Sequence, residues 1–350
     1  MVRGFGLVVG QDLWSVRNYS AAFPRSHLAG VMSYVALADV AAGLDDATDY
    51  GTGIEWARGL VAAYDPSTAL QLGLYLKGAL DDVNNGALDA QIRRLAAFAD
   101  ELAPRLILLR IGYEFDSPLN GYEPAAYIAA FRRVAAGMPV NVRNVWHSWA
   151  FAPWEADGGA GVAAWWPGEE HVDVCAVSIF QQAFGDYAET PWGGGGNLSY
   201  AHLLADFCEG RGKPLIIAES TPFGLGVVEP FETIWARWFE PVLDFIEKRG
   251  VTHWSYINCD WDAQPMWHGQ GWGDTRIEAD PNLKAHWEAQ VLDAPVLYTS
   301  RASHAYYGVA AAAAAAVCAA LCAARFCAAG KRPARGPDGP NWRRVDDQNQ

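Results

Sequence analysis

Basic residues, methionine and cysteine are scarce in this 350-residue chain. Its 26 lysines and arginines are outnumbered by 40 aspartates and glutamates, which gives a formal net charge of −14. A chain of this sign is not expected to bind nucleic acid, because phosphate binding needs a basic surface. The six cysteines lack the spacing of metal ligands, so we expect no metal site. Cys175, Cys208 and Cys259 are scattered, and we interpret them as small buried apolar residues.

Aromatic and apolar residues are plentiful. The chain is 51% hydrophobic, which is enough for a large core, and it contains 16 tryptophans. We expect about half of these indoles to fill space between helices and sheet, and the others to offer flat faces on which sugar rings stack. No secretory signal is visible, since "FGLVVGQDLW" near the start already has the pattern of a strand and loop.

Eight short apolar runs alternate with helical patterns along most of the chain. The runs cover residues 5–12, 28–34, 70–76, 106–114, 142–148, 172–180, 214–220 and 251–258. Strands that alternate with helices in this number predict an α/β protein with a (β/α)8 TIM barrel, here over residues 1–295. A doubly wound open sheet could use the same elements, but it would carry a glycine-rich phosphate turn after its first strand, and "VVGQDLW" has none.

The remainder of the chain has a different composition. We expect a linker over 296–307, an alanine-rich helix over 308–329 and a disordered basic tail over 330–350. The uncharged stretch 308–324 is a candidate transmembrane anchor near the lower length limit. Basic residues after it would place the barrel on the extracellular or lumenal side. The alternative is a low-complexity alanine run with no membrane role, in a soluble protein. A third arrangement is a tail anchor that leaves the barrel in the cytosol.

The stretch "LILLRIGYEFDS" ends a buried strand with charges. Arg110 and Glu114 share the parity of Leu106 and Leu108, so all four side chains are predicted to point into the barrel. Buried charges are rare unless they are paired or functional. In a TIM barrel the active site lies at the carboxyl ends of the strands, which is where Glu114 falls.

A second acid ends the seventh predicted strand, "PLIIAES". Leu215, Ile217 and Glu219 have one parity, so Glu219 is also predicted to point inward at the mouth. Two carboxylates on either side of a glycosidic bond, about 5 Å apart, are what retaining glycoside hydrolysis needs. Arg110 is the best candidate for a cation that keeps the nucleophile ionised. A catalytically silent Arg110–Glu114 ion pair is the alternative.

These motifs resemble those of glycoside hydrolase family 26. "RIGYE" is similar to the acid/base segment of that family, "KPLIIAES" to its nucleophile segment and "NVWHS" to its fifth strand. The resemblance covers residues 5–292 and implies that Glu114 is the acid/base and Glu219 the nucleophile. It also implies activity on β-mannans or related β-linked glucans and xylans, without a metal or organic cofactor.

The sequence departs from the family at two positions. Tyr113 stands where the family has a histidine before its acid/base. Phe180 ends the sixth predicted strand, where many relatives have a tyrosine that donates a hydrogen bond to the nucleophile. Phenylalanine cannot donate that bond, so either a glutamine (Gln181 or Gln182) or Tyr256 on the eighth strand is expected to replace the tyrosine.

Further residues are candidates for binding substrate because of their position at strand ends or in the loop after the eighth strand. The substrate-binding candidates are Arg110, Tyr113, Asp12, Trp146, Tyr256, Asn258, Trp261 and Asp262. Trp146 is assigned to the barrel interior and His147, of opposite parity, to the core. The loop after the eighth strand could instead be a purely structural lid, and "PWGGGGN" (191–197) is interpreted as a lid because it lacks the lysine of a phosphate-binding loop.

The leading functional hypothesis is therefore a retaining β-glycoside hydrolase, endo-β-mannanase-like or a related β-glycanase, whose partner is a polysaccharide or oligosaccharide. Transglycosylation would use the same site. The alternative from another class is a catalytically inactive glycan-binding barrel tethered to a membrane. Sequence alone leaves the glycan and its linkage open.

Overall fold

The structure is a computed structural model, and it describes residues 4–149, 161–180, 198–224 and 230–293. These residues belong to the first of two compact units, Met1–Leu297; the second unit is Tyr298–Gln350. The predicted linker, alanine-rich helix and basic tail lie outside the described residues. Within the described ranges, no helix is both long and apolar enough to cross a membrane.

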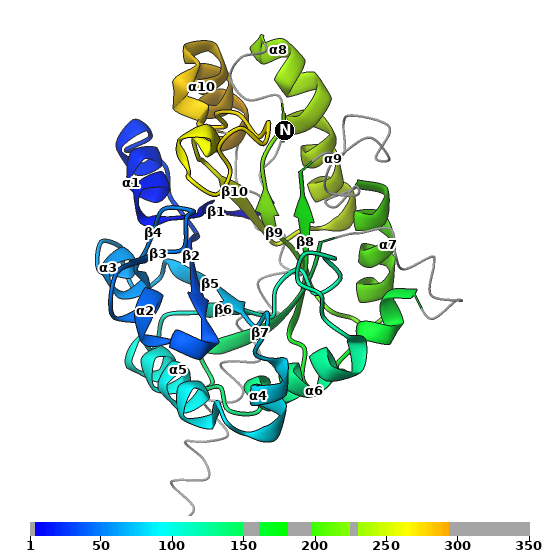
Figure 1. Cartoon of the computed structure of the whole chain (residues 1–350). Coiled ribbons are helices and arrows are strands. Elements are labelled where there is room, and N and C mark those ends of the chain that lie inside the picture. The colour runs from blue at the N-terminus through cyan, green and yellow to red at the C-terminus, as the bar shows by residue number, and fades with distance from the viewer. Residues whose placement is uncertain (1–3, 150–160, 181–197, 225–229, 294–350) are drawn as a thin grey trace, which may run out of the picture. The chain divides into compact units, whose positions relative to one another are not determined.

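Eight parallel strands form a closed barrel, in the order β1-β10-β9-β8-β7-β6-β5-β2 (Figure 1). The strands are β1 (Gly6–Gly10), β2 (Gly30–Ala36), β5 (Ala69–Tyr75), β6 (Ile107–Ile111), β7 (Val142–Ser148), β8 (Val174–Ile179), β9 (Leu215–Ser220) and β10 (His253–Ile257). This confirms the predicted TIM barrel and all eight predicted strands. The open-sheet alternative is wrong, because β1 pairs with both β2 and β10.

Helices enclose the ring of strands, as Figure 1 shows. They are α1 (Leu13–Ala22), α2 (Ala41–Leu44), α3 (Ala57–Val61), α4 (Leu80–Asn85), α5 (Asp89–Glu101), α6 (Pro124–Ala135), α7 (Leu198–Glu209), α8 (Phe231–Ile234), α9 (Glu240–Arg249) and α10 (Pro281–Trp287). Short 3-10 turns are Leu37–Asp39, Gly161–Trp165, Trp261–Ala263 and Ile277–Ala279, and π-helical turns are Trp235–Phe239 and Glu288–Leu292. Before α3, Ile54–Glu55 forms the short strand β4, which pairs antiparallel with β3 (Thr48–Asp49).

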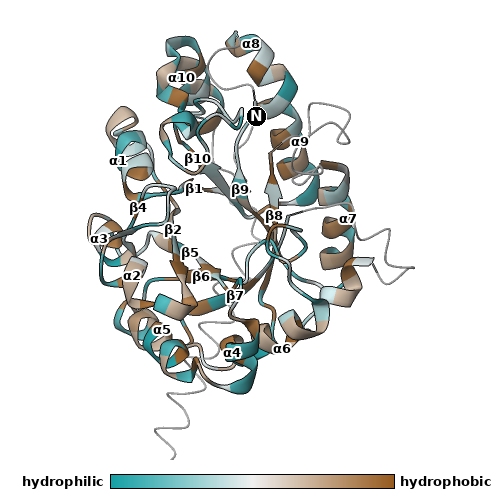
Figure 2. Cartoon of the chain, in the orientation of Figure 1, coloured by the Kyte–Doolittle hydropathy of each residue, from teal (hydrophilic) through white to brown (hydrophobic). Residues whose placement is uncertain are grey.

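Alternate residues of each strand face the helices, and the residues between them face the barrel axis. Ile107, Leu109 and Ile111 of β6 belong to the large apolar core shared with the helices. Leu108 and Arg110 therefore face inward, as their parity predicts. In Figure 2 apolar colouring is prominent on β5, β6 and β8, and the helices carry both apolar and hydrophilic patches. The helix-facing side chains of the strands belong to the large apolar core. The inward-facing positions can therefore include charged residues such as Arg110 and Glu219.

A disulfide joins β8 to α7. Cys175 and Cys208 are bonded, with their Cα atoms 6.4 Å apart, and both residues are fully buried. Both cysteines are buried in the apolar core, as predicted, but the bond between them was not predicted, because residues 33 positions apart in sequence meet only when the helix folds back on its strand. Cys259 is a buried free thiol, as expected.

Candidate active site

Arg110 and Glu219 meet inside the barrel. The Arg110 guanidinium donates through Nη1 to Glu219 Oε1, and the two residues are 0% and 7% exposed. The guanidinium carbon lies 4.8 Å from the ring centre of Tyr34 and 5.2 Å from that of Tyr113. Gly73 makes room for this group, because a Cβ at that position would lie 2.7 Å from Arg110 Nη2. Arg110 therefore neutralises Glu219, and the proposed Arg110–Glu114 ion pair is wrong.

A bulge in β9 turns Glu219 inward. Val177 of β8 pairs with Ile217, but the next residue, Ser178, pairs with Glu219, so Ala218 is an extra residue in β9. Leu215 and Ile217 belong to the helix-facing core. The prediction that Leu215, Ile217 and Glu219 share one face was therefore wrong for the two apolar residues. Glu219 faces inward because the extra residue shifts the alternation of side chains by one.

Glu114 lies in a tight turn beyond the end of β6. The strand ends at Ile111, and Glu114 itself has a left-handed backbone conformation, with φ of 53°. Asn120 Nδ2 donates to the carbonyl oxygens of Tyr113 and Glu114, at 3.0 and 2.9 Å. The Asp116 carboxylate accepts from Ser148 Oγ at 2.8 Å and from the next backbone N–H at 2.6 Å. The position of the Glu114 carboxyl group is therefore set by a turn that these hydrogen bonds hold in place, and not by the alternation of side chains along β6.

The two candidate catalytic acids lie on either side of Ser178. Ser178 is the register partner of Glu219, and its hydroxyl donates to Glu114 Oε1 at 2.6 Å. Burial raises the pKa of Glu114 well above its usual value, and the charge of Glu219 raises it further. Weaker opposing effects come from the Ser178 hydrogen bond and from Arg110. Glu114 therefore holds a proton to higher pH than an ordinary glutamate, which suits a proton donor.

The predicted faces of Trp146 and His147 are reversed in the structure. Trp146 is fully buried among helix-facing residues, and its ring stacks on Phe115 with ring centres 4.6 Å apart. It cannot contact substrate there, so its assignment as a binding residue was wrong. His147 points into the barrel, where its Nε2 lies 2.9 Å from Ser178 Oγ. Burial lowers its pKa well below the usual value, and the Arg110 charge adds to that effect.

Tyr256 also faces the helices. It is fully buried, and its hydroxyl donates to the Thr275 carbonyl oxygen at 2.6 Å. Tyr256 therefore neither floors a sugar site nor donates to the nucleophile, and both predictions were wrong. Asn258 follows β10 and is likewise buried; it accepts from Ile277 N at 2.8 Å and donates to Glu278 at 2.9 Å. Its amide organises the adjoining loop. The alternative donors Gln181 and Gln182 lie outside the described residues.

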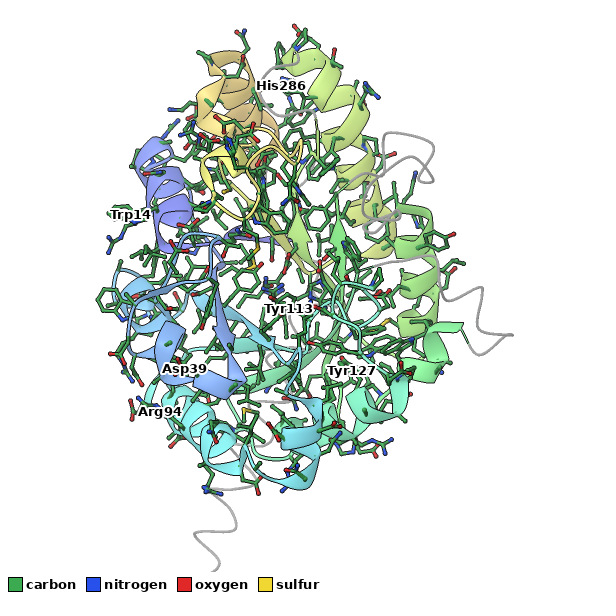
Figure 3. The ribbon with its side chains drawn as sticks, in the orientation of Figure 1. Trp14, Asp39, Arg94, Tyr113, Tyr127 and His286 are labelled. Atoms are coloured by element: carbon green, nitrogen blue, oxygen red, sulfur yellow. A yellow bond between two sulfur atoms is a disulfide. The ribbon has the colours of Figure 1, made fainter. Side chains whose placement is uncertain are left out.

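An aromatic cluster covers part of the barrel mouth. Trp261 is 2% exposed; its ring centre lies 4.7 Å from that of Trp272, and its Nε1 donates to Thr275 Oγ1. Because the Trp261 indole is buried, the loop is better described as a structural lid than as a surface on which a sugar ring stacks. Asp262, one residue later, is exposed. Tyr113 is partly buried and belongs to the same mouth cluster, and it lies near the middle of the ring of strands in Figure 3.

Asp12 caps α1 and borders a cavity of about 350 Å³ at the carboxyl end of the barrel. Its Oδ1 accepts from Trp14 N at 2.7 Å and Ser15 N at 3.2 Å. Its Oδ2 accepts from Ser15 Oγ. The polar groups of Asn258, Asp260 and Arg276 in this cavity wall also bond to other residues of the chain. Asp12 is thus occupied as a helix cap, although it does line a cavity.

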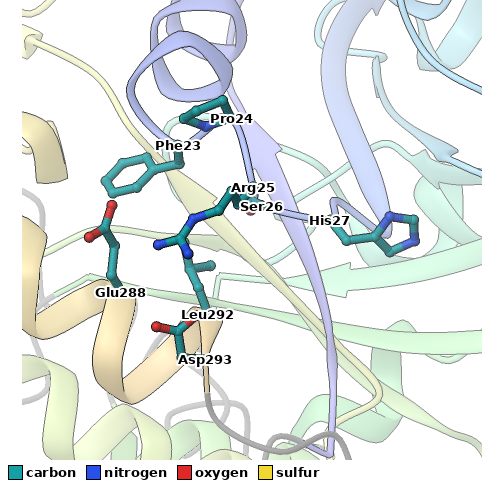
Figure 4. Close-up of a pocket in the computed structure, with 8 residues that line it drawn as sticks. All are labelled: Phe23, Pro24, Arg25, Ser26, His27, Glu288, Leu292 and Asp293. Atoms are coloured by element: carbon teal, nitrogen blue, oxygen red, sulfur yellow. The ribbon is translucent and has the colours of Figure 1, made fainter.

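Figure 4 shows a second cavity, of about 160 Å³, which none of the candidate catalytic acids lines. Its lining comes from residues 23–27, in the loop that precedes β2, and from the last described helical turn, where Glu288, Leu292 and Asp293 contribute. This loop enters the barrel at the amino ends of the strands. Active sites of TIM barrels lie at the opposite end. Across the described residues, no cluster of three or more histidine, cysteine, aspartate or glutamate side chains could hold a metal ion.

Sequence reasoning missed three residues of the site: Tyr34, Gly73 and Ser178. Each lies on an inward-facing position of a strand that was correctly predicted. Ser178 could have been noticed as a polar residue near the end of the apolar run "VDVCAVSIF". The need for Gly73 depends on Arg110 lying against it, which no local pattern indicates.

The closed (β/α)8 barrel thus brings together one buried acid bonded to arginine and a second acid whose pKa is raised. The chain is similar in sequence to two proteins named β-1,3-xylanases. It is 30% identical over 318 residues to the β-1,3-xylanase TXYA of a Vibrio species. It is also 30% identical over 307 residues to a β-1,3-xylanase of an Alcaligenes species.

The alignments cover 83% and 80% of this chain, but only 65% and 62% of the length of the two xylanases. No protein-family model matches the chain. A family 26 β-mannanase of Bacteroides ovatus has a similar fold, with a TM-score of 0.57 and 11% sequence identity. That comparison covers 85% of this chain and 91% of the mannanase chain. At that identity the likeness concerns the fold alone.

Proposed function

We propose that the protein is a retaining β-glycanase in which Glu114 is the acid/base and Glu219 the nucleophile. The observation that carries this proposal is the contrast between the two carboxyl groups. Glu219 is bonded to the buried cation Arg110, which provides a counter-charge for a carboxylate nucleophile inside the barrel. Glu114 is bonded to a neutral serine, and its pKa is raised by burial and by Glu219.

The proposed reaction has two displacements. In the first, Glu114 gives its proton to the glycosidic oxygen while a Glu219 carboxylate oxygen attacks the anomeric carbon, so the leaving sugar departs as an alcohol. In the second, the Glu114 carboxylate takes a proton from water, and the resulting hydroxide displaces Glu219 from the anomeric carbon. When the glycosyl ester breaks, Glu219 becomes a carboxylate again and re-forms its ion pair with Arg110.

We propose β-1,3-xylan as the first substrate to test. The two proteins at 30% identity are named β-1,3-xylanases, whereas the named mannanase shares only the fold at 11% identity. β-Mannan is therefore the second candidate. Tyr113, partly buried beside Arg110 at the barrel mouth, is the proposed ring face nearest the reacting sugar.

We also propose that the barrel works in an oxidising compartment. The support is the Cys175–Cys208 disulfide, because structural disulfides persist mainly in secreted or lumenal proteins. A location outside the cell would also give the protein access to a polysaccharide substrate.

The decisive experiment measures hydrolysis of β-1,3-xylan, β-mannan and β-glucan by wild type, Glu114→Gln and Glu219→Gln. The exposed Glu247→Gln serves as a matched control for the change of a carboxyl to an amide. We expect each site variant to lose at least ~100-fold in kcat and the control to keep wild-type activity. Proton NMR of the first product should show the β-anomer. Full activity in either site variant, or no cleavage of any glycan by wild type, would refute the proposal.

A further inference from the structure

Glu114 is the end of a hydrogen-bond chain that begins inside the barrel. His147 Nε2 lies 2.9 Å from Ser178 Oγ, and Ser178 Oγ lies 2.6 Å from Glu114 Oε1. His147 belongs to β7 and Ser178 to β8, while Glu114 follows β6. Both inner residues are 0% exposed. Strands β7 and β8 and the turn after β6 thus contribute one residue each to a connected chain of polar groups.

The direction of the chain follows from the number of available hydrogens. A serine hydroxyl has a single proton, so when Ser178 donates to Glu114 it can only accept from His147. His147 must then carry its hydrogen on Nε2. In this tautomer Nδ1 is a bare acceptor, and it has no hydrogen-bond partner among the described residues. The opposite tautomer would bury an unpaired N–H at that position, which proteins rarely tolerate.

We propose that His147 and Ser178 are positioning residues for Glu114 and that they assign its transferable proton to Oε2. A carboxyl oxygen that accepts a hydrogen bond from serine is the one that remains unprotonated, so the proton resides on the other oxygen. Within the described ranges, no hydrogen bond from protein reaches Oε2. This inference rests on the proposed function, in which Glu114 gives up that proton to the glycosidic oxygen.

Other charged and titratable groups also act on Glu114, and the experiment must separate their effects from that of Ser178. Those groups are Glu219 on β9, Arg110 on β6, and Asp116, Tyr113 and Tyr122 beyond the end of β6. A substitution at Ser178 leaves all of them in place. His147 adds no charge of its own, because burial keeps its pKa far below the usual value and the imidazole neutral.

The primary test follows the ionisation of Glu114 and does not depend on enzymatic activity. Protein labelled with 13C at the glutamate carboxyl carbons is titrated by NMR, and the Glu114 signal is assigned by its loss in Glu114→Gln. We expect Ser178→Ala to raise the pKa of Glu114, since it removes a hydrogen bond that favours the charged form. Ser178→Thr should restore the wild-type titration, and His147→Phe should move it in the same direction as Ser178→Ala.

Ser220→Ala is the matched control for losing a buried serine hydroxyl. Ser220 lies on β9, fully buried, and its hydroxyl donates to the Ser255 carbonyl oxygen at 2.7 Å and accepts from Trp254 Nε1 at 2.8 Å. We expect it to leave the Glu114 titration unchanged. An unchanged titration in Ser178→Ala, or an equal shift in Ser220→Ala, would overturn the proposal.

A kinetic test addresses the positioning role. A dinitrophenyl glycoside releases a phenolate that needs no proton, whereas a glycan needs the proton from Glu114. Ser178→Ala should therefore lose roughly tenfold in kcat on the glycan, a part of what general acid catalysis contributes, and less than twofold on the aryl glycoside. Equal losses on both substrates would refute positioning. If Glu114→Gln retains full activity, the proposed function fails, and the NMR titration still decides whether Ser178 controls the proton.

Discussion

Arg110 of β6 and Glu219 of β9 lie 109 positions apart in the sequence and form a buried ion pair inside the barrel. Two strands, β7 and β8, separate them in the ring. Arg110 has one carboxylate partner, and its Nε and Nη2 groups have no hydrogen-bond acceptor among the described residues. The rings of Tyr34 and Tyr113 contact the guanidinium instead. Cation–π contact of this kind compensates in part for the loss of water around a buried charge.

Breaking this ion pair should destabilise the fold as well as the site. Arg110→Met leaves the Glu219 carboxylate buried without a cation, and such changes cost about 3–5 kcal/mol in the free energy of unfolding. The double variant Arg110→Met/Glu219→Gln should regain much of that stability and stay inactive. Denaturant unfolding of the three proteins measures this. Equal stability of wild type and Arg110→Met would contradict the prediction.

Gly73→Ala should disturb the same ion pair from the neighbouring strand. An added Cβ would lie 2.5 Å from Tyr34 Cδ1 and 2.7 Å from Arg110 Nη2, so both side chains must move. We expect a loss of roughly tenfold or more in kcat/KM, since small displacements at catalytic groups have effects of this size. Gly210→Ala is the control, because its Cβ would make ordinary contacts, at 3.4 Å or more. Similar activity in the two variants would contradict the prediction.

Trp146 should matter for stability and not for substrate affinity. Trp146→Ala removes a fully buried indole from the helix-facing core, which is expected to cost about 3–5 kcal/mol in the free energy of unfolding. The milder Trp146→Phe should keep KM for the glycan within twofold of wild type. Trp14→Ala, at a position 54% exposed, should change stability little. A large rise in KM for Trp146→Phe would restore the original assignment of Trp146 to the substrate site.

Glu55 should make stability depend on pH. Its carboxylate accepts from Ser33 Oγ at 2.6 Å and Tyr34 N at 2.9 Å, and burial raises its pKa well above the usual value. The folded protein therefore binds this proton more tightly than the unfolded chain. Its contribution to stability is present below the unfolded pKa of about 4.3 and is lost as pH rises through the folded pKa.

Glu55→Gln does not titrate, so its free energy of unfolding should fall less steeply with pH than that of wild type. The difference in slope should approach about 1.4 kcal/mol per pH unit between the unfolded and folded pKa values. Glu114 has the same sign of effect, but it is present in both proteins and cancels in the comparison. Parallel stability curves for the two proteins would show that Glu55 is ionised in the fold.

The Cys175–Cys208 disulfide should stabilise the barrel. A bond that closes a loop of 33 residues is expected to contribute about 3–4 kcal/mol by restricting the unfolded chain. The double variant Cys175→Ala/Cys208→Ala should therefore unfold at lower denaturant concentration. Wild type should become similar to it when a reductant is added. Cys259→Ala, which removes the buried free thiol, should keep the full response to reductant; no response in wild type would mean that the bond does not form.

The barrel and the two acids could be predicted from the sequence. Eight apolar runs separated by helical patterns, with no glycine-rich turn after the first run, favoured a barrel over an open sheet, and Glu114 and Glu219 both come at the carboxyl ends of such runs. The parity of Arg110 was also correctly predicted, because β6 is regular through Ile111. Side chains alternate strictly along a regular strand, so once the face of one residue is known, the faces of the others follow.

Which face of a strand points inward was decided only by tertiary structure. Strands of a parallel barrel are apolar on both faces, so Trp146 and His147, or Tyr256 and its neighbours, can be assigned to either side from sequence. In β9 the bulge at Ala218 changes the alternation between Ile217 and Glu219. Such a bulge depends on pairing with β8, and that pairing cannot be read from the six residues that form the strand. Long-range packing therefore fixed the orientation of side chains whose positions along the chain were already known.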